Sequence, residues 1–395
     1  MRIAMMSAWN SDSGVSVHAE LVGREWVKMG HQLRVFTFFK SDFHGTAILG
    51  KDEDYVTRCF TTSGSVHRYL DPRPILSADY EVFVVQDLGM LPKDELAKIF
   101  HHIRRKASTI TVIHDSGPSP DPSFYQFDWD GVVCFDRRYE EFLQKYHQVD
   151  KIYTIPFPCH PLQRGNQQEA RAKLGLPDEK KIILIFGQRV KEHLPLLPII
   201  REVNSNLPVL LLVVSQKDVD ELRGLEGIEM EIRRESPTID SLYDYLHASD
   251  ILILHRNPCD GVVVSSAAFQ CLGSGCPILA RRSPFFETLS DVVITYSDFR
   301  EFKESLLDLL QRGRKYQSSQ KSLEEFIKRN SAEFVAKSYI DLFKAIEGKR
   351  KQWILRQTSS VFGAIRPTPE TERETSGFPS IPHLQKSKDL TLQPH

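Results

Sequence analysis

Two cations, Arg189 and Lys191, follow directly after the apolar run of residues 181–186. Such a run is typical of a buried parallel strand, and ligands of open α/β sheets bind at the carboxyl edge, where these two residues would stand. Paired cations at that edge suit a diphosphate, whose developing charge they would neutralise. The spacing therefore predicts a phosphate site. The alternative is a pair of solvated loop charges.

A second candidate for phosphate binding lies in residues 255–280. The apolar run 251–254 precedes a polar loop, and we expect a helix that begins near Val263 and ends before Gly273. The N-terminal amides of that helix, together with the hydroxyls of Ser265 and Ser266, would point at a bound phosphate. The alternative is one more strand–helix–strand unit that binds no ligand.

The first strand–helix junction, residues 7–16, is a third candidate. It is polar, contains Gly14 and leads into a helical pattern, so its free N–H groups could hold an anion. A helix start capped by Asp12 or Ser13 would explain the same residues without a ligand.

Taken together, these stretches resemble the retaining glycosyltransferases of family 4 and their relatives, over about residues 1–346. The resemblance implies a GT-B fold, in which two Rossmann-like, doubly wound domains face a cleft and helices close the C-terminal end. It also implies transfer of a sugar from a nucleotide-sugar donor to an acceptor of unknown identity, with retention of configuration and without a metal. The elements that carry it are Gly14 with Gly30-His31, the linker 155–158, Gly187 with Arg189 and Lys191, and residues 274–278 around Gly275 and Pro277.

The chain departs from the family's pattern in its acidic and histidine residues. The two glutamates that precede the Gly-x-Pro element in the family fall on Val262 and Gln270 here. Gln270 would bond a ribose hydroxyl, and Asp260 would replace the first glutamate from a longer loop. Gln86 stands where the family often has a catalytic histidine. His114, at the end of the next strand, is a candidate either for acceptor contacts or for a structural role.

The resemblance leads to two hypotheses of different class. The first is a glycosyltransferase whose donor lies against the second domain and whose acceptor enters near Gln86, Asp87, His114 and Asp115. The second is a catalytically silent relative that binds a nucleotide sugar or a partner; a nucleotide-sugar epimerase on the same fold is a weaker third. The implied donor-binding residues are Gly14, Arg189, Lys191, Ser265, Ser266 and Gln270, and the implied catalytic candidates are Asp260, Gln86 and His114.

Alternating apolar runs and helical patterns must position these residues. In the first half, strand-like runs at 1–7, 33–38, 80–86, 109–114, 131–135 and 151–155 alternate with helical patterns at 15–29, 92–106 and 137–146. Prolines interrupt at 156–161, and the alternation resumes with strands at 181–186, 209–214, 228–232, 251–254 and 278–280 and helices at 167–174, 194–203 and 239–248. The pattern predicts an α/β protein with domains at 1–157 and 158–346, closing helices at 299–311 and 323–346, an interruption at Gly348 and a disordered tail at 357–395.

Composition narrows the remaining function classes. The net charge is −1 over 395 residues, so no global field attracts nucleic acid. No run approaches the roughly 18 apolar residues that span a membrane. Six scattered cysteines and an N-terminus unlike a signal peptide indicate reduced thiols and a cytoplasmic location. Asp128, Asp130 and Asp136 are spaced as ordinary loop carboxylates, so no metal site is predicted. Residues 349–351 with Trp353 predict either weak peripheral contact with an acidic membrane surface or a solvated helix end.

Overall fold

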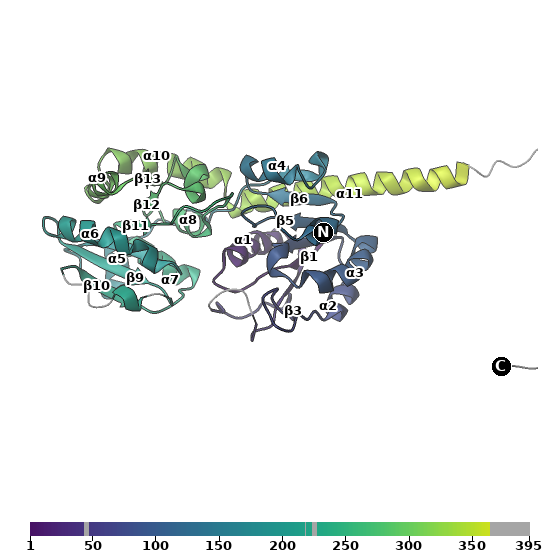
Figure 1. Ribbon diagram of the computed structural model, residues 1–395, viewed down its shortest axis with the longest axis horizontal. Coiled ribbons are helices and arrows are strands. Elements are labelled where there is room, and N and C mark those ends of the chain that lie inside the picture. The colour runs from purple at the N-terminus through teal and green to yellow at the C-terminus, as the bar shows by residue number, and fades with distance from the viewer. Residues whose placement is uncertain (43–46, 218, 223–226, 364–395) are drawn as a thin grey trace, which may run out of the picture. The chain divides into compact units, whose positions relative to one another are not determined.

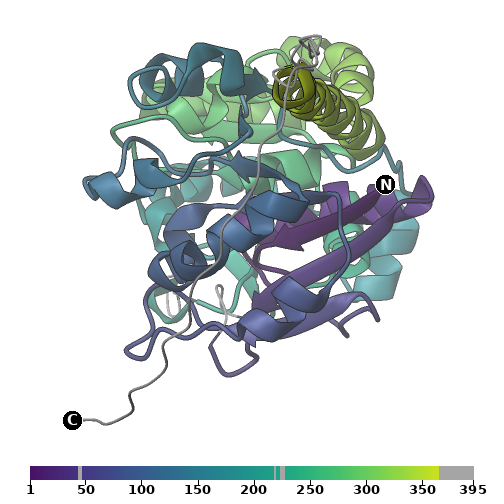
Figure 2. The same cartoon turned by 90° about the vertical axis from the view of Figure 1, so that its right-hand side faces the viewer.

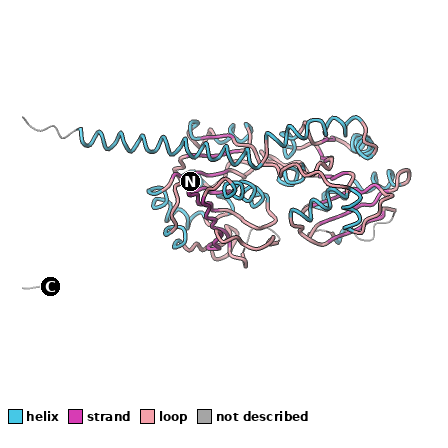
Figure 3. Tube along the Cα trace, turned by 180° about the vertical axis from the view of Figure 1, so that it is seen from behind, coloured by secondary structure: helices cyan, strands magenta, loops and turns pink. Residues whose placement is uncertain are grey.

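The computed structural model describes residues 1–42, 47–217, 219–222 and 227–363, with side chains as far as residue 352. Met1–Arg350 form one compact unit, and a second unit begins at Lys351. Two separate sheets lie within the first unit, and helices pack on both faces of the second sheet (Figure 3).

The first sheet has seven parallel strands in the order β3-β2-β1-β4-β5-β6-β7. The order reverses between β1 and β4, which makes that point a topological switch point. Figure 2 shows β1 and β2, in purple, side by side. The strands are β1 (Arg2–Met6), β2 (Gln32–Phe38), β3 (Val56–Phe60), β4 (Val82–Gln86), β5 (Ser108–Val112), β6 (Gly131–Cys134) and β7 (Ile152–Thr154).

The second sheet has six parallel strands in the order β10-β9-β8-β11-β12-β13 (Figure 1). Its switch point lies between β8 and β11. The strands are β8 (Lys181–Phe186), β9 (Val209–Val214), β10 (Glu229–Arg233), β11 (Ile251–Leu254), β12 (Ile278–Arg281) and β13 (Ile294–Tyr296). Two doubly wound parallel sheets, as expected from the alternating pattern, are therefore confirmed.

Helices cover both faces of the second sheet because its strands are apolar on both sides. Along β8, Ile183 and Ile185 pack in the cluster that contains residues of α6 and α9, whereas Ile182 and Leu184 belong to the larger cluster that includes α7. The helices are α1 (Gly14–Lys28), α2 (Pro72–Ser77), α3 (Lys93–Lys106), α4 (Arg137–Leu143), α5 (Gln167–Leu174), α6 (Leu197–Asn204), α7 (Ile239–Ala248), α8 (Ser266–Leu272), α9 (Phe299–Leu310), α10 (Arg314–Arg329) and α11 (Ala332–Gly363).

The C-terminal helices differ from the prediction in two ways. The helix expected over 323–346 is broken at Asn330, so that α10 and α11 are separate, and α11 continues through Gly348. The proline-rich segment 156–161 holds the break: Cys159 N–H donates to the carbonyl of Asn330 (2.6 Å), and Ala332 N–H donates to the carbonyl of Cys159 (3.1 Å). A continuous apolar stripe thus conceals a turn that a distant segment helps to stabilise.

Helix α11 packs against the first sheet's side of the molecule rather than the second. Trp26 of α1 donates from Nε1 to the carbonyl of Ala336 (3.1 Å), and its ring meets that of Phe343 at 5.4 Å. Gly131 at the start of β6 lies so close to Ile346 that a Cβ there would approach its Cδ1 to 2.8 Å. The N-terminal part of α11 therefore completes the core of the first sheet.

The structure tests the predicted tail at 357–395 only in part, and it does not test the predicted boundary between the two domains. Both sheets belong to the unit Met1–Arg350, so the boundary between 157 and 158 stays a prediction. Of the tail expected to be disordered, 357–363 are helical, as the last part of α11, and 364–395 lie outside the described residues.

Candidate functional site

A cavity of about 320 Å³ lies beside the switch point of the second sheet. Its lining includes residues that follow the carboxyl ends of β8, β9, β10 and β11, together with the first turns of α1 and α8. The volume falls in the range of about 300–1,000 Å³ that is usual for small-molecule sites, and the switch point is where doubly wound sheets bind ligands. The lining residues used below are Asp12, Gly14, Gly187, Arg189, Gln216, Glu235, Arg256, Ser266 and Gln270.

Arg256 is the most informative residue of this cavity. It follows β11 by two residues, is 7% exposed, and its Nη1 has no hydrogen-bond partner. Burial lowers the pKa of its guanidinium to about 10, Glu192 opposes that shift, and the neighbouring charge of Arg189 adds to it. Glu192 compensates part of this buried charge, but the nearby Arg189 adds a second cation, and an excess of buried positive charge is costly without an anion. The cavity is therefore built to receive an anion.

Arg189 supplies the second cation, whereas Lys191 does not line the cavity. Arg189 is half-exposed, lies 3.5 Å from a carboxylate oxygen of Glu192 and stands over the ring of Phe285. Lys191 belongs to the 3₁₀ helix Val190–Leu196, which turns it towards Glu221, 2.9 Å away. The pair of cations expected at this edge is thus formed by Arg189 and Arg256. Arg256 had no role in the sequence-based prediction.

Glycines let the backbone pass closely at two points of the site. Gly187, directly after β8, has φ +105°, which non-glycine residues rarely adopt, and its position faces Nη2 of Arg256. A Cβ on Gly14 would lie 2.7 Å from Oγ of Ser266, so the first turns of α1 and α8 are in contact there. Gly14 therefore permits the approach of α8, and the predicted approach to the phosphates of a ligand stays a prediction.

Helix α8 starts later than expected, which changes the roles open to its serines. It begins at Ser266 instead of near Val263, and Oγ of the buried Ser265 accepts the N–H of Ala268 as N-cap (3.3 Å). Helix α8 has only seven residues, so we assign no anion site to its N-terminus. Ser266 and Gln270 do line the cavity, and Ser265 does not.

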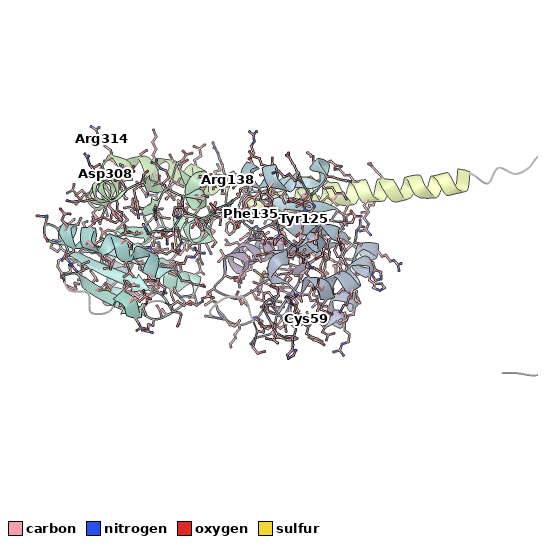
Figure 4. All side chains as sticks on the ribbon, in the orientation of Figure 1. Cys59, Tyr125, Phe135, Arg138, Asp308 and Arg314 are labelled. Carbon is pink, nitrogen blue, oxygen red and sulfur yellow. The ribbon has the colours of Figure 1, made fainter. Side chains whose placement is uncertain are left out.

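Contacts with the first half of the chain keep residues 262–264 extended. The N–H of Val262 donates to the carbonyl of Ser116 (2.7 Å), and the carbonyl of Val263 accepts from Nη2 of Arg138 (3.3 Å). Arg138, labelled in Figure 4, also donates to the carbonyl of Pro284 (2.7 Å). These partners compete with helical hydrogen bonds, and valines are poor helix formers. That is why the expected start near Val263 was wrong.

The Gly-x-Pro element lies away from this cavity. Gly275 and Pro277 precede β12, so they stand at the amino edge of the sheet, where they border a separate cavity of about 200 Å³. Gly275 has φ +77°, which explains the glycine by backbone conformation. The element therefore supports the architecture and does not touch the cavity that contains Arg256.

The catalytic candidates do not meet at the cavity. Gln86 is fully buried at the end of β4, where its Oε1 accepts from Nε2 of His114 (3.0 Å) and its Nε2 has no partner. His114 packs edge-on against His18 (5.2 Å), and burial lowers the pKa values of both imidazoles, that of His18 to about 3. Asp260 is exposed on the loop after β11. None of the three lines the cavity.

A pair of carboxyl groups, Asp87 and Asp115, follows the carboxyl ends of β4 and β5. A Cβ on Gly89 would lie 2.8 Å from Oδ1 of Asp115 and 3.1 Å from Oδ1 of Asp87, so both groups lie over that glycine. Burial, and next the charge of Asp115, raises the pKa of Asp87 to about 7; burial also raises the pKa of Asp115. The pair therefore retains a proton at pH values where unfolded aspartates are ionised.

Replacing Asp115 by asparagine is expected to stabilise the fold at pH 8 and to have little effect at pH 4. A carboxyl whose pKa is raised by folding holds its proton between about pH 4 and pH 7 only in the folded state, so stability falls as pH rises through that window. The neutral amide removes the cost of ionising Asp115 and its repulsion of Asp87, whereas the burial of Asp87 keeps the rest, so we expect a gain of about 1 kcal/mol at pH 8, since one pKa unit corresponds to about 1.4 kcal/mol. Thermal unfolding at pH 4, 6 and 8 measures it.

The matched control is Asp128→Asn. Lys151 and Arg104 hold Asp128 and lower its pKa, so that substitution should bring no gain at pH 8. A stabilisation of Asp115→Asn that is equal at all three pH values would contradict the assignment of a shared proton.

Other predicted features have structural explanations. Nη2 of Arg350 donates to the carbonyls of Arg104 (2.6 Å) and Arg105 (3.0 Å), and Nζ of Lys349 lies 3.3 Å from the hydroxyl of Tyr153. The side chain of Trp353 lies outside the described part. Within the described ranges no group of three or more His, Cys, Asp or Glu residues could hold a metal ion, and no helix is long and apolar enough to cross a bilayer.

The fold defined by these two sheets is that of the GT-B glycosyltransferases. No model of a known protein family matches the chain. Among solved structures, sucrose-phosphate synthase from Thermosynechococcus elongatus matches with a TM-score of 0.63 at 13% identity, over 88% of this chain and 100% of that one. The Anabaena protein HepE in complex with UDP-glucose matches with a TM-score of 0.62 at 13% identity, over 87% and 100%. The pneumococcal O-GlcNAc transferase GtfA in complex with UDP and GlcNAc gives 0.61 at 12%, over 88% and 99%.

These matches confirm the predicted GT-B fold, and they confirm the resemblance to family-4 glycosyltransferases at the level of fold. Identities of 12–14% carry no information on the reaction of this chain. The residues of the cavity are therefore the remaining guide to the function of this chain.

Proposed function

We propose that this chain is a glycosyltransferase that binds a nucleotide-sugar donor in the cavity beside β8 and β11 and transfers the sugar to an acceptor with retention of configuration. The observation that carries the proposal is the buried Arg256, which lines the cavity and whose Nη1 has no hydrogen-bond partner. A diphosphate would add negative charge beyond that of Glu192, and its oxygens match the fork of N–H donors of a guanidinium. The GT-B fold supports the same reading.

In this proposal the two arginines do the principal chemical work. Arg189 and Arg256 would hold the diphosphate and stabilise the negative charge that grows on it as its bond to the sugar breaks. Such stabilisation is strong where burial excludes water. Ser266 and Gln270 would bond hydroxyl or phosphate oxygens of the donor, since both border the cavity. The acceptor would approach from the side of Asp87 and Asp115.

A silent donor-binding protein is the second candidate, because one observation favours it. Neither Gln86, His114 nor Asp260 borders the cavity, so the residues expected to assist proton transfer are not assembled there. Binding and turnover must therefore be measured separately.

Calorimetric titration with GDP and with UDP tests donor binding, and hydrolysis of GDP-mannose and UDP-glucose tests turnover. We expect at least one diphosphate to bind and to raise the melting temperature in proportion to the logarithm of its concentration. Sugar release from the matching donor would support the enzyme, whereas tight binding without release would favour the silent protein. The proposal fails if no nucleoside diphosphate binds.

A cytoplasmic location completes the proposal. All six cysteines are free, and five of them are buried. Buried thiols in a large chain suit a reducing compartment.

A further inference from the structure

The donor cavity has chemically different ends. Arg256 follows the last residue of β11 by two positions, and Glu235 follows the last residue of β10 by two positions. The strands between them are β8 and β9, so the ends of β10 and β11 are three strand spacings apart, about 14 Å. One end is therefore cationic and the other carries a carboxylate.

This arrangement orients a nucleoside diphosphate. Its phosphates belong with Arg189 and Arg256, since a carboxylate repels them. An extended ligand that starts there runs past Gly187 and across the end of β9, and its base arrives among Gln216, Glu235 and Pro237. The crevice along strand ends is the usual path for such ligands.

Glu235 has unused hydrogen-bond acceptor capacity at the end of the cavity where the base would lie. It is half-buried, accepts a hydrogen bond from the hydroxyl of Tyr245, and makes no ion pair with any residue in the described ranges. Nη1 of Arg233 also donates to that hydroxyl (3.3 Å), which fixes its position. An ionised carboxylate has about four lone-pair sites, so one tyrosine leaves most of its capacity unused.

We infer that Glu235 selects guanine, and hence that the donor is a guanosine-diphosphate sugar. Guanine presents two adjacent donors, N1–H and the exocyclic N2 amino group, which a carboxylate accepts together. Uracil presents a single N–H between two carbonyl oxygens, which a carboxylate repels. Gln216, exposed at the same end, has an amide N–H₂ for the O6 acceptor of guanine. The inference rests on the proposed function and adds the identity of the base.

The test compares three free nucleotides in calorimetric titrations of the full chain. GDP is expected to bind at least about tenfold more tightly than UDP, the lower range of a good bidentate contact. IDP, which lacks only the N2 amino group, is expected to bind at least about tenfold more weakly than GDP, since a hydrogen bond to a charged group contributes about 1.5–3 kcal/mol. Neither comparison requires a variant, so neither depends on the folding of a mutant.

Glu235→Gln then assigns the selection to this residue. The variant should lose most of the GDP preference and no longer distinguish GDP from IDP, while its affinity for UDP stays within about twofold of the wild type. Glu229→Gln is the matched control, since Glu229 lies at the opposite end of β10 and pairs with Lys180. Its nucleotide affinities should be unchanged.

The outcomes separate this inference from the proposed function. Equal or tighter binding of UDP, with affinity that depends on Arg256, would overturn the guanine assignment and leave the proposed function standing. A GDP preference that survives Glu235→Gln would overturn the role of Glu235. If none of the three nucleotides bound, both proposals would fall together.

Discussion

Replacing Arg256 by methionine is expected to abolish the binding of nucleoside diphosphates and to leave the fold as stable as before or more so. The guanidinium is buried, faces the charge of Arg189 and has an unpartnered nitrogen, so the free protein bears its desolvation cost. Methionine has similar length without the charge, and its apolar chain suits the buried position. Removal of that cost should raise stability by about 1–3 kcal/mol.

The loss of affinity should be large. Truncation of one partner of a buried charge pair costs about 2–5 kcal/mol, which corresponds to about 30- to 5,000-fold in Kd. Calorimetric titration gives the affinity, and scanning calorimetry gives the melting temperature with and without nucleotide. Arg282→Met is the matched control, because Arg282 is 64% exposed and does not border the cavity. If Arg256→Met unfolded the protein or bound nucleotide normally, the guanidinium would be structural.

Asp250→Ala is expected to destabilise the second sheet by about 3–5 kcal/mol, because it leaves a buried arginine without its counter-ion. Asp250 and Arg171 are 2.8 Å apart, and both side chains are 6% exposed. Oδ2 of Asp250 also accepts the N–H of Ile182 at the second residue of β8 (2.8 Å). The melting temperature should fall by roughly 5–15 °C.

The control is an exposed ion pair that also involves α5. Asp244 pairs with Lys173 between α7 and α5, and the lysine is 66% exposed, so Asp244→Ala should cost less than about 1 kcal/mol. The double variant Arg171→Met with Asp250→Leu should recover part of the stability, since an apolar pair can replace a buried ion pair, but the N–H of Ile182 stays without its acceptor. Equal losses for Asp250→Ala and Asp244→Ala would show that the buried pair has no special weight.

The apolar runs predicted the sheets well because parallel strands are buried on both faces. Residues 181–186 and 209–214 coincide with β8 and β9, and the helical pattern at 239–248 coincides with α7. The runs failed where burial is partial. Strand β3 (Val56–Phe60) escaped notice because it is an edge strand that contains Arg58, and α2 (Pro72–Ser77) is too short to show a period.

The site residues that follow β8 could be predicted from the sequence. Arg256 could not, because its place beside β8 depends on the order of the strands in the sheet. Gly187 and Arg189 stand out because they directly follow an apolar run. Arg256 also follows such a run, but the sequence does not show whether an arginine in a loop is exposed or buried. The missing step was the strand order: in a doubly wound sheet the first and fourth strands are neighbours, which places the end of β11 beside the end of β8. That rule would have identified Arg256.

Contacts of α11 with Trp26 and Gly131 have a consequence for the order in which the chain is made. The first sheet is finished at Thr154, but the helix that closes its core starts at Ala332. At a synthesis rate of about 5–20 residues per second, roughly 10–35 s pass between the two on the ribosome. During that interval the surface of α1 that α11 will cover is exposed. The second sheet is therefore synthesised before the core of the first sheet is complete.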